Sequence, residues 1–94
     1  MEIASIQHKG LLAYFTSGDS KGLRQDLVLR LQNILTALDV TADVEGLEGP
    51  PGWRVHQLKG DRAGVWSISV SGNWRLTFTV KDNVIHDLNL EDYH

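Results

Sequence analysis

The sequence contains no cysteine, which excludes disulfide bonds, thiolate metal sites and a cysteine nucleophile. It also has no apolar run near the ~20 residues of a membrane-spanning helix. Residues 1–5 do not form the basic and then apolar pattern of a secretion signal. We therefore expect a cytoplasmic protein with no membrane partner, stabilised by packing alone.

An excess of positive charge is missing as well. Nine Lys and Arg residues against twelve Asp and Glu residues give a net charge of -3, which at first argues against a nucleic-acid partner. The charges are unevenly distributed, however. Acids crowd into residues 39–48, whereas residues 54–75 contain a single acid, Asp61. The cations of that second segment are Arg54, Lys59, Arg62 and Arg75.

The composition is that of a folded globular domain, with 41% hydrophobic and 22% charged residues. A chain of 94 residues is long enough for one hydrophobic core. We expect a single domain over residues 1–94.

Glycine and proline divide the chain into a helical half and a strand half, at residues 18–22 and 49–52. Leu27, Leu31, Ile34 and Leu38 recur at helical spacing and predict an amphipathic helix over residues 24–38. A short strand over residues 3–7 and a short helix over residues 9–15 are predicted before it.

Beyond residue 52 the hydrophobic period changes to two, which predicts strands over residues 65–70, 74–80 and 84–90. Turn residues at 71–73 and 81–83 join them into an antiparallel meander. In the last strand we expect Val84, Leu88 and Leu90 to share one face. Helices packed on the apolar face of this sheet give an α+β fold, and Arg75 then lies on the opposite, polar face.

The four histidines are the natural candidates for proton transfer near neutral pH. His8 is expected to be solvated near a turn, and His86 shares the parity of Val84 and is expected at the edge of the core. His56 is followed by Lys59, and this pair would suit either proton transfer beside a phosphate or a plain surface strand. The position of His94 in the sequence gives no indication of a role by itself.

No metal or cofactor is expected. The histidines and carboxylates show neither the H-E-x-x-H spacing of a zinc site nor a glycine-rich acidic calcium loop. The sequence also lacks a phosphate-binding glycine loop and a G-x-S-x-G nucleophile motif.

Three blocks of sequence, at residues 56–68, 73–78 and 91–94, resemble the HigB-type toxins of the RelE superfamily. The resemblance implies a RelE-like fold, with N-terminal helices packed on a twisted antiparallel sheet whose concave face binds RNA. It implies a toxin of a type II toxin–antitoxin system that cleaves mRNA in the A site of the 70S ribosome. It also implies a helix-turn-helix, HigA-like antitoxin as partner, with operator DNA contacted only through the antitoxin complex.

The resemblance also carries over a set of candidate site residues. These are His56, Lys59, Arg75, Asp92, Tyr93 and His94, with Arg54 and Arg62 as additional phosphate contacts. Metal-free RNA cleavage uses the substrate 2'-OH as nucleophile, so one group must remove a proton and another must donate one. Our hypothesis gives these roles to His56 and His94, with Asp92 assisting. Arg75 would then bind the scissile phosphate, and Tyr93 would stack on a nucleotide.

Toxins of this superfamily are usually basic, whereas this chain is mildly acidic, so weaker ribosome affinity is predicted. One alternative is a non-catalytic RelE-fold module that blocks the ribosome or acts as corepressor with its antitoxin. Another is a nuclease that acts on free RNA without a ribosome.

Overall fold

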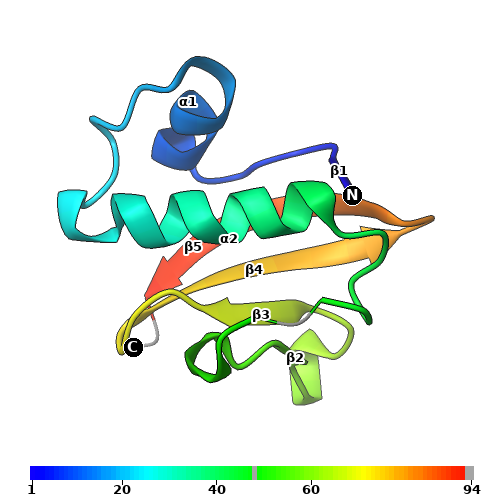
Figure 1. Cartoon of the computed structure of the whole chain (residues 1–94). Coiled ribbons are helices and arrows are strands. Elements are labelled where there is room, and N and C mark those ends of the chain that lie inside the picture. Colours follow the sequence, from blue (N-terminus) through cyan, green and yellow to red (C-terminus); the bar gives the residue numbers. More distant parts are fainter. Residues whose placement is uncertain (48, 93–94) are drawn as a thin grey trace.

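The computed structural model describes residues 1–47 and 49–92. Its elements in chain order are β1 (Glu2–Ile3), α1 (Lys9–Ser17), the 3-10 turn η1 (Gln25–Leu27), α2 (Val28–Val40), η2 (Pro51–Trp53), β2 (His56–Gln57), η3 (Gly60–Arg62), β3 (Trp66–Ser69), β4 (Trp74–Lys81) and β5 (Val84–Asp92). The predicted α+β arrangement is confirmed, with α2 lying across the sheet (Figure 1).

The five strands form one sheet in the order β1-β5-β4-β3-β2. Strands β3 to β5 are antiparallel neighbours, as the meander predicted, and β2 pairs with β3 in the same way. Strand β1 was not predicted to run parallel to β5, yet Glu2 pairs with Val84 and Ile3 with Ile85 in that direction. The sheet is therefore mixed, because the chain leaves β1, passes through both helices and enters the sheet again at the opposite edge, at β2.

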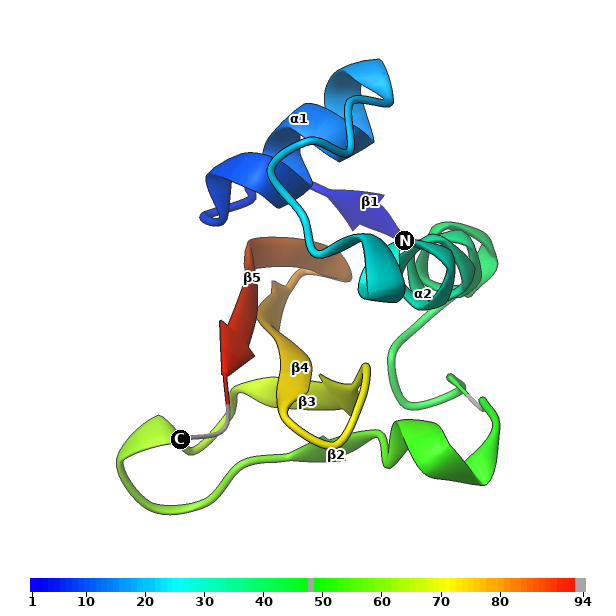
Figure 2. The same cartoon turned by 90° about the vertical axis from the view of Figure 1, so that its left-hand side faces the viewer.

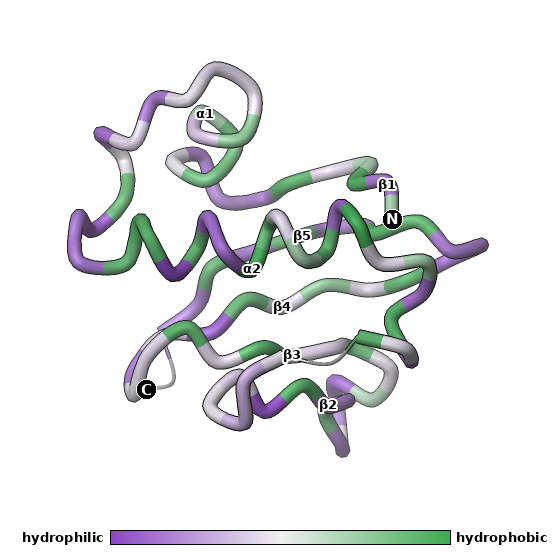
Figure 3. Tube along the Cα trace, in the orientation of Figure 1, coloured by the Kyte–Doolittle hydropathy of each residue, from purple (hydrophilic) through white to green (hydrophobic). Residues whose placement is uncertain are grey.

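One face of the sheet packs against the helices to form the hydrophobic core. Helix α2 contributes its predicted apolar stripe, and Figure 2 shows this helix nearly end-on beside the strands. Figure 3 shows hydrophobic residues alternating with hydrophilic ones along α2, which lies over the central strands. The hydrophobic residues with at most 1% exposure are Leu11, Leu27, Leu31, Ile34, Leu38, Ile68, Leu76, Phe78, Ile85 and Leu88.

Helix α1 has a defined cap at each end. His8, which we expected to be solvated, is the N-cap, and its Nδ1 accepts a hydrogen bond from the Leu11 amide at 3.1 Å. Gly18 ends the helix with a positive φ of 74°. Near the start of α1, a Cβ added to Gly10 would lie 2.2 Å from the Gly22 carbonyl oxygen, so only glycine fits this approach.

Strand β5 contains a β-bulge that changes which residues face the core. Thr79 pairs with His86, whereas Thr77 pairs with Asn89, so β5 has one residue more than β4 over this span. The extra residue is Asp87, whose φ is 56°. The prediction that Val84 shares a face with Leu88 and Leu90 is therefore wrong, and the prediction of a core-edge His86 is wrong for the same reason. Ile85 takes the core position, and Val84 and His86 lie on the face of Thr79.

Neither helix in the described part of the chain is long and apolar enough to cross a membrane.

Candidate active site

The sheet face turned away from the helices carries three rows of polar side chains, which we call the polar face. Because residues paired across antiparallel strands point to the same side, the register defines these rows. The first row contains His56, Ser67, Thr77 and Asn89, the second contains Ser69, Arg75 and Glu91, and the third contains Thr79 and His86. The strands thus bring His56 and Arg75, far apart in sequence, to one surface.

His56 is exposed in the edge strand β2, and its ring orientation is set by the backbone. Its Nδ1 lies 2.5 Å from the carbonyl oxygen of Arg54. A carbonyl can only accept a hydrogen bond, so Nδ1 carries a proton, and when the ring is neutral Nε2 is the nitrogen that can accept one. This arrangement suits general acid–base chemistry at Nε2.

Arg75 is half-buried in strand β4, with Ser69 on one side and Glu91 on the other. Its Cα lies two strands from His56 and two residues further along, a separation of about 12 Å from strand spacings. This distance leaves room for a substrate phosphate between the two side chains.

Glu91 lies at the centre of the cationic part of the polar face. Its two carboxylate oxygens accept hydrogen bonds from Nη1 and Nη2 of Arg62 at 2.7 and 2.6 Å. The Thr77 hydroxyl donates a further bond to it, and Nη2 of Arg75 lies 4.0 Å from its Oε1. The hydrogen bonds from Arg62 hold the pKa of the Glu91 carboxyl below its ordinary value, and they outweigh the opposing effect of burial.

The loop between β2 and β3 carries Lys59 and Arg62. Its ends are closed by a backbone bond of 2.8 Å from the Leu58 amide to the Val65 carbonyl. Lys59 is exposed at the N-cap of η3, and Arg62, at the end of η3, reaches the sheet. The predicted phosphate contacts Lys59 and Arg62 thus lie on one short loop beside Arg75.

Arg54 lies at the other side of β2, as the exposed residue that follows η2. It lines a hollow of about 400 Å³ together with Gly52, Ser69, Ser71 and Gly72. Ser69 belongs to the same row as Arg75, so Arg54 borders the polar face rather than lying within it.

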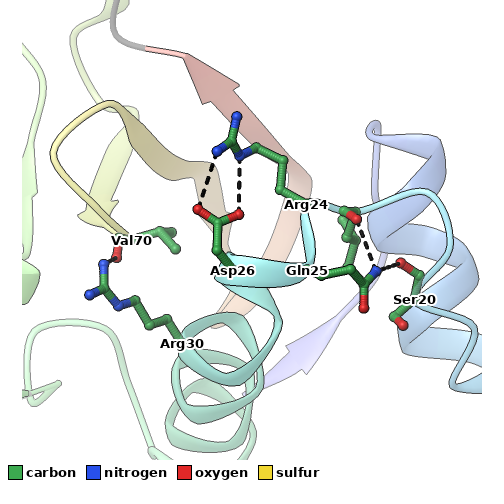
Figure 4. A network of polar contacts seen from close by, with 7 residues as sticks. Ser20, Arg24, Gln25, Asp26, Arg30 and Val70 are labelled. Atoms are coloured by element: carbon green, nitrogen blue, oxygen red, sulfur yellow. Dashed lines mark hydrogen bonds and ion pairs between the residues drawn. The ribbon is translucent and has the colours of Figure 1, made fainter.

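Asp92 is not brought onto the polar face. It pairs with Trp74, whose side chain packs against the core, so its register points to the helix side of the sheet. Asp26 raises the pKa of Arg24 through a hydrogen bond, and the charge of Asp92 adds a smaller effect in the same direction. Figure 4 shows Arg24 and Asp26 at that side of the sheet. The candidates Tyr93 and His94 lie outside the described residues.

A cavity of about 350 Å³ opens on the polar face beside Arg62 and Glu91. Its lining includes Gln7, Val65, Thr77, Thr79, Asp87 and Asn89. Our sequence analysis missed Glu91 and Asn89 as site residues. The signal for both was their alternation with the core residues Leu88 and Leu90, which places them on the opposite face. No group of three His, Asp or Glu side chains that could hold a metal ion occurs within residues 1–47 and 49–92.

A family model and a related protein of known name match nearly the whole chain and agree with each other. A family model described as the RelE-like toxin of type II toxin–antitoxin system HigB matches residues 4–94. Endoribonuclease HigB of Proteus vulgaris is 40% identical over 92 residues, which cover 98% of this chain and 99% of that protein.

Solved structures of toxins share the fold. YafQ from E. coli matches with a TM-score of 0.62 at 16% identity, over 98% of this chain and 90% of that one. The heterotetrameric YoeB-YefM toxin–antitoxin complex from Staphylococcus aureus contains a chain that matches with a TM-score of 0.63 at 22% identity, over 100% of this chain and 97% of that one. At these identities the structural likeness establishes the fold alone.

Proposed function

The chain belongs to the family of HigB-like toxins, the RelE-like toxins of type II toxin–antitoxin systems, and from this premise we propose that it cleaves mRNA in the ribosomal A site. The relative from Proteus vulgaris bears the name endoribonuclease, which supports the nuclease activity. The observation that carries the proposal is the polar face, where a histidine with an available Nε2 and an arginine lie on one surface.

The chemistry follows from the groups that this surface offers. The substrate 2'-oxygen attacks the adjacent phosphorus, the bond from phosphorus to the 5'-oxygen breaks, and the 2'-proton must leave while the 5'-oxygen gains one. We assign these two proton transfers to His56 and His94 as a pair. DNA lacks the 2'-OH and is not a substrate.

The remaining candidates bind and orient the substrate. Arg75 offers a planar fork to the phosphate oxygens and stays charged at every relevant pH, and Lys59 adds a second positive charge from the loop. Tyr93 stacks on or hydrogen-bonds to a splayed nucleotide. Asp92 acts as a positioning residue for the C-terminal segment, in keeping with its register on the helix side of the sheet.

A protein antitoxin is the proposed partner that keeps the enzyme inactive. The toxin–antitoxin complex from Staphylococcus aureus supports this by fold similarity. We propose a helix-turn-helix, HigA-like antitoxin, with operator DNA reached only through the complex. Action on ribosomes places the toxin in the cytoplasm.

The proposal is tested by primer extension on a defined mRNA incubated with the purified protein and programmed ribosomes. Cuts within the A-site codon are expected with ribosomes, none without them, and none with His94→Ala. If the mRNA stayed intact while translation stopped, the proposed cleavage would be wrong and the protein would act by blocking the ribosome. Cuts in ribosome-free RNA would overturn the requirement for the ribosome.

A further inference from the structure

The loop of residues 58–65 joins β2 to β3, and the side chain of Arg62 hydrogen-bonds it to the sheet. Backbone bonds close the loop on itself, from the Leu58 amide to the Val65 carbonyl and from the Val65 amide to the Arg62 carbonyl. Among the described residues, the pair between Arg62 and Glu91 is its one side-chain hydrogen-bonded link to another element. Lys59 lies between the backbone closure at Leu58 and this link at Arg62, so the link restrains the part of the loop that carries it.

The link has the geometry of a rigid attachment. Two parallel bonds of 2.7 and 2.6 Å join the guanidinium to the carboxylate, and such bidentate pairs fix direction as well as distance. The carboxylate is itself held by the Thr77 hydroxyl on the neighbouring strand. Its side chain is 22% exposed, so solvent weakens the pair less than it would at an open surface.

Glu91 also lies beside the proposed phosphate site. It pairs with Arg75 across the strands, and its Oε1 is 4.0 Å from Nη2 of Arg75. An anion at this place repels a substrate phosphate, so its charge by itself weakens RNA binding. The face therefore contains an acid whose electrostatic effect opposes the proposed function, and its contacts must supply a compensating role.

We propose that Glu91 is a positioning residue of the ribonuclease, which fixes the 58–65 loop so that Lys59 and Arg75 address the same phosphate. This inference rests on the proposed function. It assigns Arg62 to holding the loop through Glu91, in place of direct phosphate binding. It also explains why a bidentate ion pair occupies a surface that must attract RNA.

Glu91→Gln distinguishes the effect of the Glu91 charge from the effect of its link to the loop, because the two change different measured quantities. Removing a negative charge strengthens ribosome binding, whereas releasing the loop slows cleavage by roughly 10- to 100-fold, the cost of misplacing a catalytic group. We therefore expect an unchanged or lower Kd for programmed ribosomes together with a lower single-turnover cleavage rate.

Asp61→Asn is the matched control. It also removes one negative charge, from the loop itself, whereas Glu91 lies on β5, and Asp61 is exposed with no part in the link. Binding should shift in the same direction as in Glu91→Gln, while the cleavage rate stays at the wild-type value. Equal cleavage rates in Asp61→Asn and Glu91→Gln would reduce the role of Glu91 to electrostatics and overturn the proposal.

Arg62→Gln breaks the same link from the side of the loop, at a side chain that is 42% exposed. Its cleavage rate should match that of Glu91→Gln, and the double variant should lose no more than either single one. Wild-type cleavage by Arg62→Gln would contradict the proposal even if Glu91→Gln failed to fold.

Amide hydrogen exchange over residues 58–65 distinguishes failure of this inference from failure of the proposed function. Exchange should accelerate in Glu91→Gln and Arg62→Gln and stay unchanged in Asp61→Asn. If the wild-type protein cleaved no mRNA, accelerated exchange would still establish the attachment, and only the proposed function would fall. Unchanged exchange in both link variants would overturn the attachment itself.

Discussion

Cations that lie close together on a small surface repel one another. On the polar face, the single carboxylate of Glu91 reduces this repulsion. Arg62 and Arg75 both approach the carboxylate of Glu91, one in a bidentate pair and one at 4.0 Å. The acid keeps two guanidinium groups near each other in the free protein. A substrate phosphate would then meet the guanidinium of Arg75 already in place, and a donor fixed in advance is the condition for electrostatic stabilisation of a transition state.

Arg75→Ala should lower single-turnover cleavage by at least ~100-fold, the usual loss when one preorganised donor to a developing charge is removed. The fold should survive, because Glu91 keeps its bonds to Arg62 and Thr77. The measurement is the time course of primer-extension products on programmed ribosomes, with thermal unfolding as the control for folding. A stable Arg75→Ala protein that cleaves at the wild-type rate would refute the assignment.

Glu91 should also make the free energy of unfolding depend on pH under acidic conditions. Its folded-state pKa lies below the ordinary value of 4.5 because of the bonds from Arg62. A lowered pKa means that the stabilisation is complete above the unfolded-state pKa and is lost as the pH falls through the folded-state pKa. Urea unfolding from pH 7 down to pH 3 should therefore show a steeper loss below about pH 4.5 in wild type than in Glu91→Gln. Parallel curves for the two proteins would contradict this.

At the scale of elements, the bulge in β5 decides which residues belong to the core. The sequence predicted the strand, but strict alternation from Val84 misplaced the side chains before residue 87. Residues after the bulge, including Leu88 and Leu90, agree with the alternation. A single αL residue that is not glycine leaves almost no signal in a sequence, so this error could not have been avoided by pattern alone.

Asp87→Val should destabilise the protein by about 1–3 kcal/mol, because a β-branched side chain is strained at a positive φ. Asp87→Asn is the matched control, since asparagine tolerates this conformation and keeps the side-chain length. Chemical denaturation of both variants provides the comparison. Equal midpoints for Val and Asn would show that the bulge relaxes without cost.

The strand part of the candidate site could be predicted from the sequence, and the loop part could not. Period-two alternation placed Arg75 on the polar face, and the register of β2 against β3 then brought His56 there. The ion pair between Glu91 and Arg62 could not be predicted from the sequence, because Arg62 lies 29 residues away on an irregular loop. Short-range patterns report which face a strand residue occupies, and they contain no information on which loop folds over it.

The whole molecule gathers several of its cations at one face although its net charge is -3. Lys59, Arg62 and Arg75 lie at the polar face or on its loop, where Asp61 and Glu91 are neighbouring acids. Asp39 lies near the C-terminal end of α2, and Asp43 and Glu45 follow this helix, which packs against the opposite side of the sheet. An overall acidic chain can therefore still offer cations to RNA at one face, and the acids at the end of α2 disfavour binding in other orientations.

This distribution predicts a shallow salt dependence of ribosome binding. Each phosphate contact to single-stranded nucleic acid contributes a slope of about -0.7 to log K against log salt, so two to three contacts give roughly -1.4 to -2.1. Lys59→Gln should reduce the steepness by about one contact, whereas Asp43→Asn, on an exposed residue after α2, should leave it unchanged. Binding isotherms on programmed ribosomes at several salt concentrations measure these slopes. A wild-type slope several times steeper would mean that cations beyond the polar face contact the ribosome, and the confinement of RNA binding to this face would be wrong.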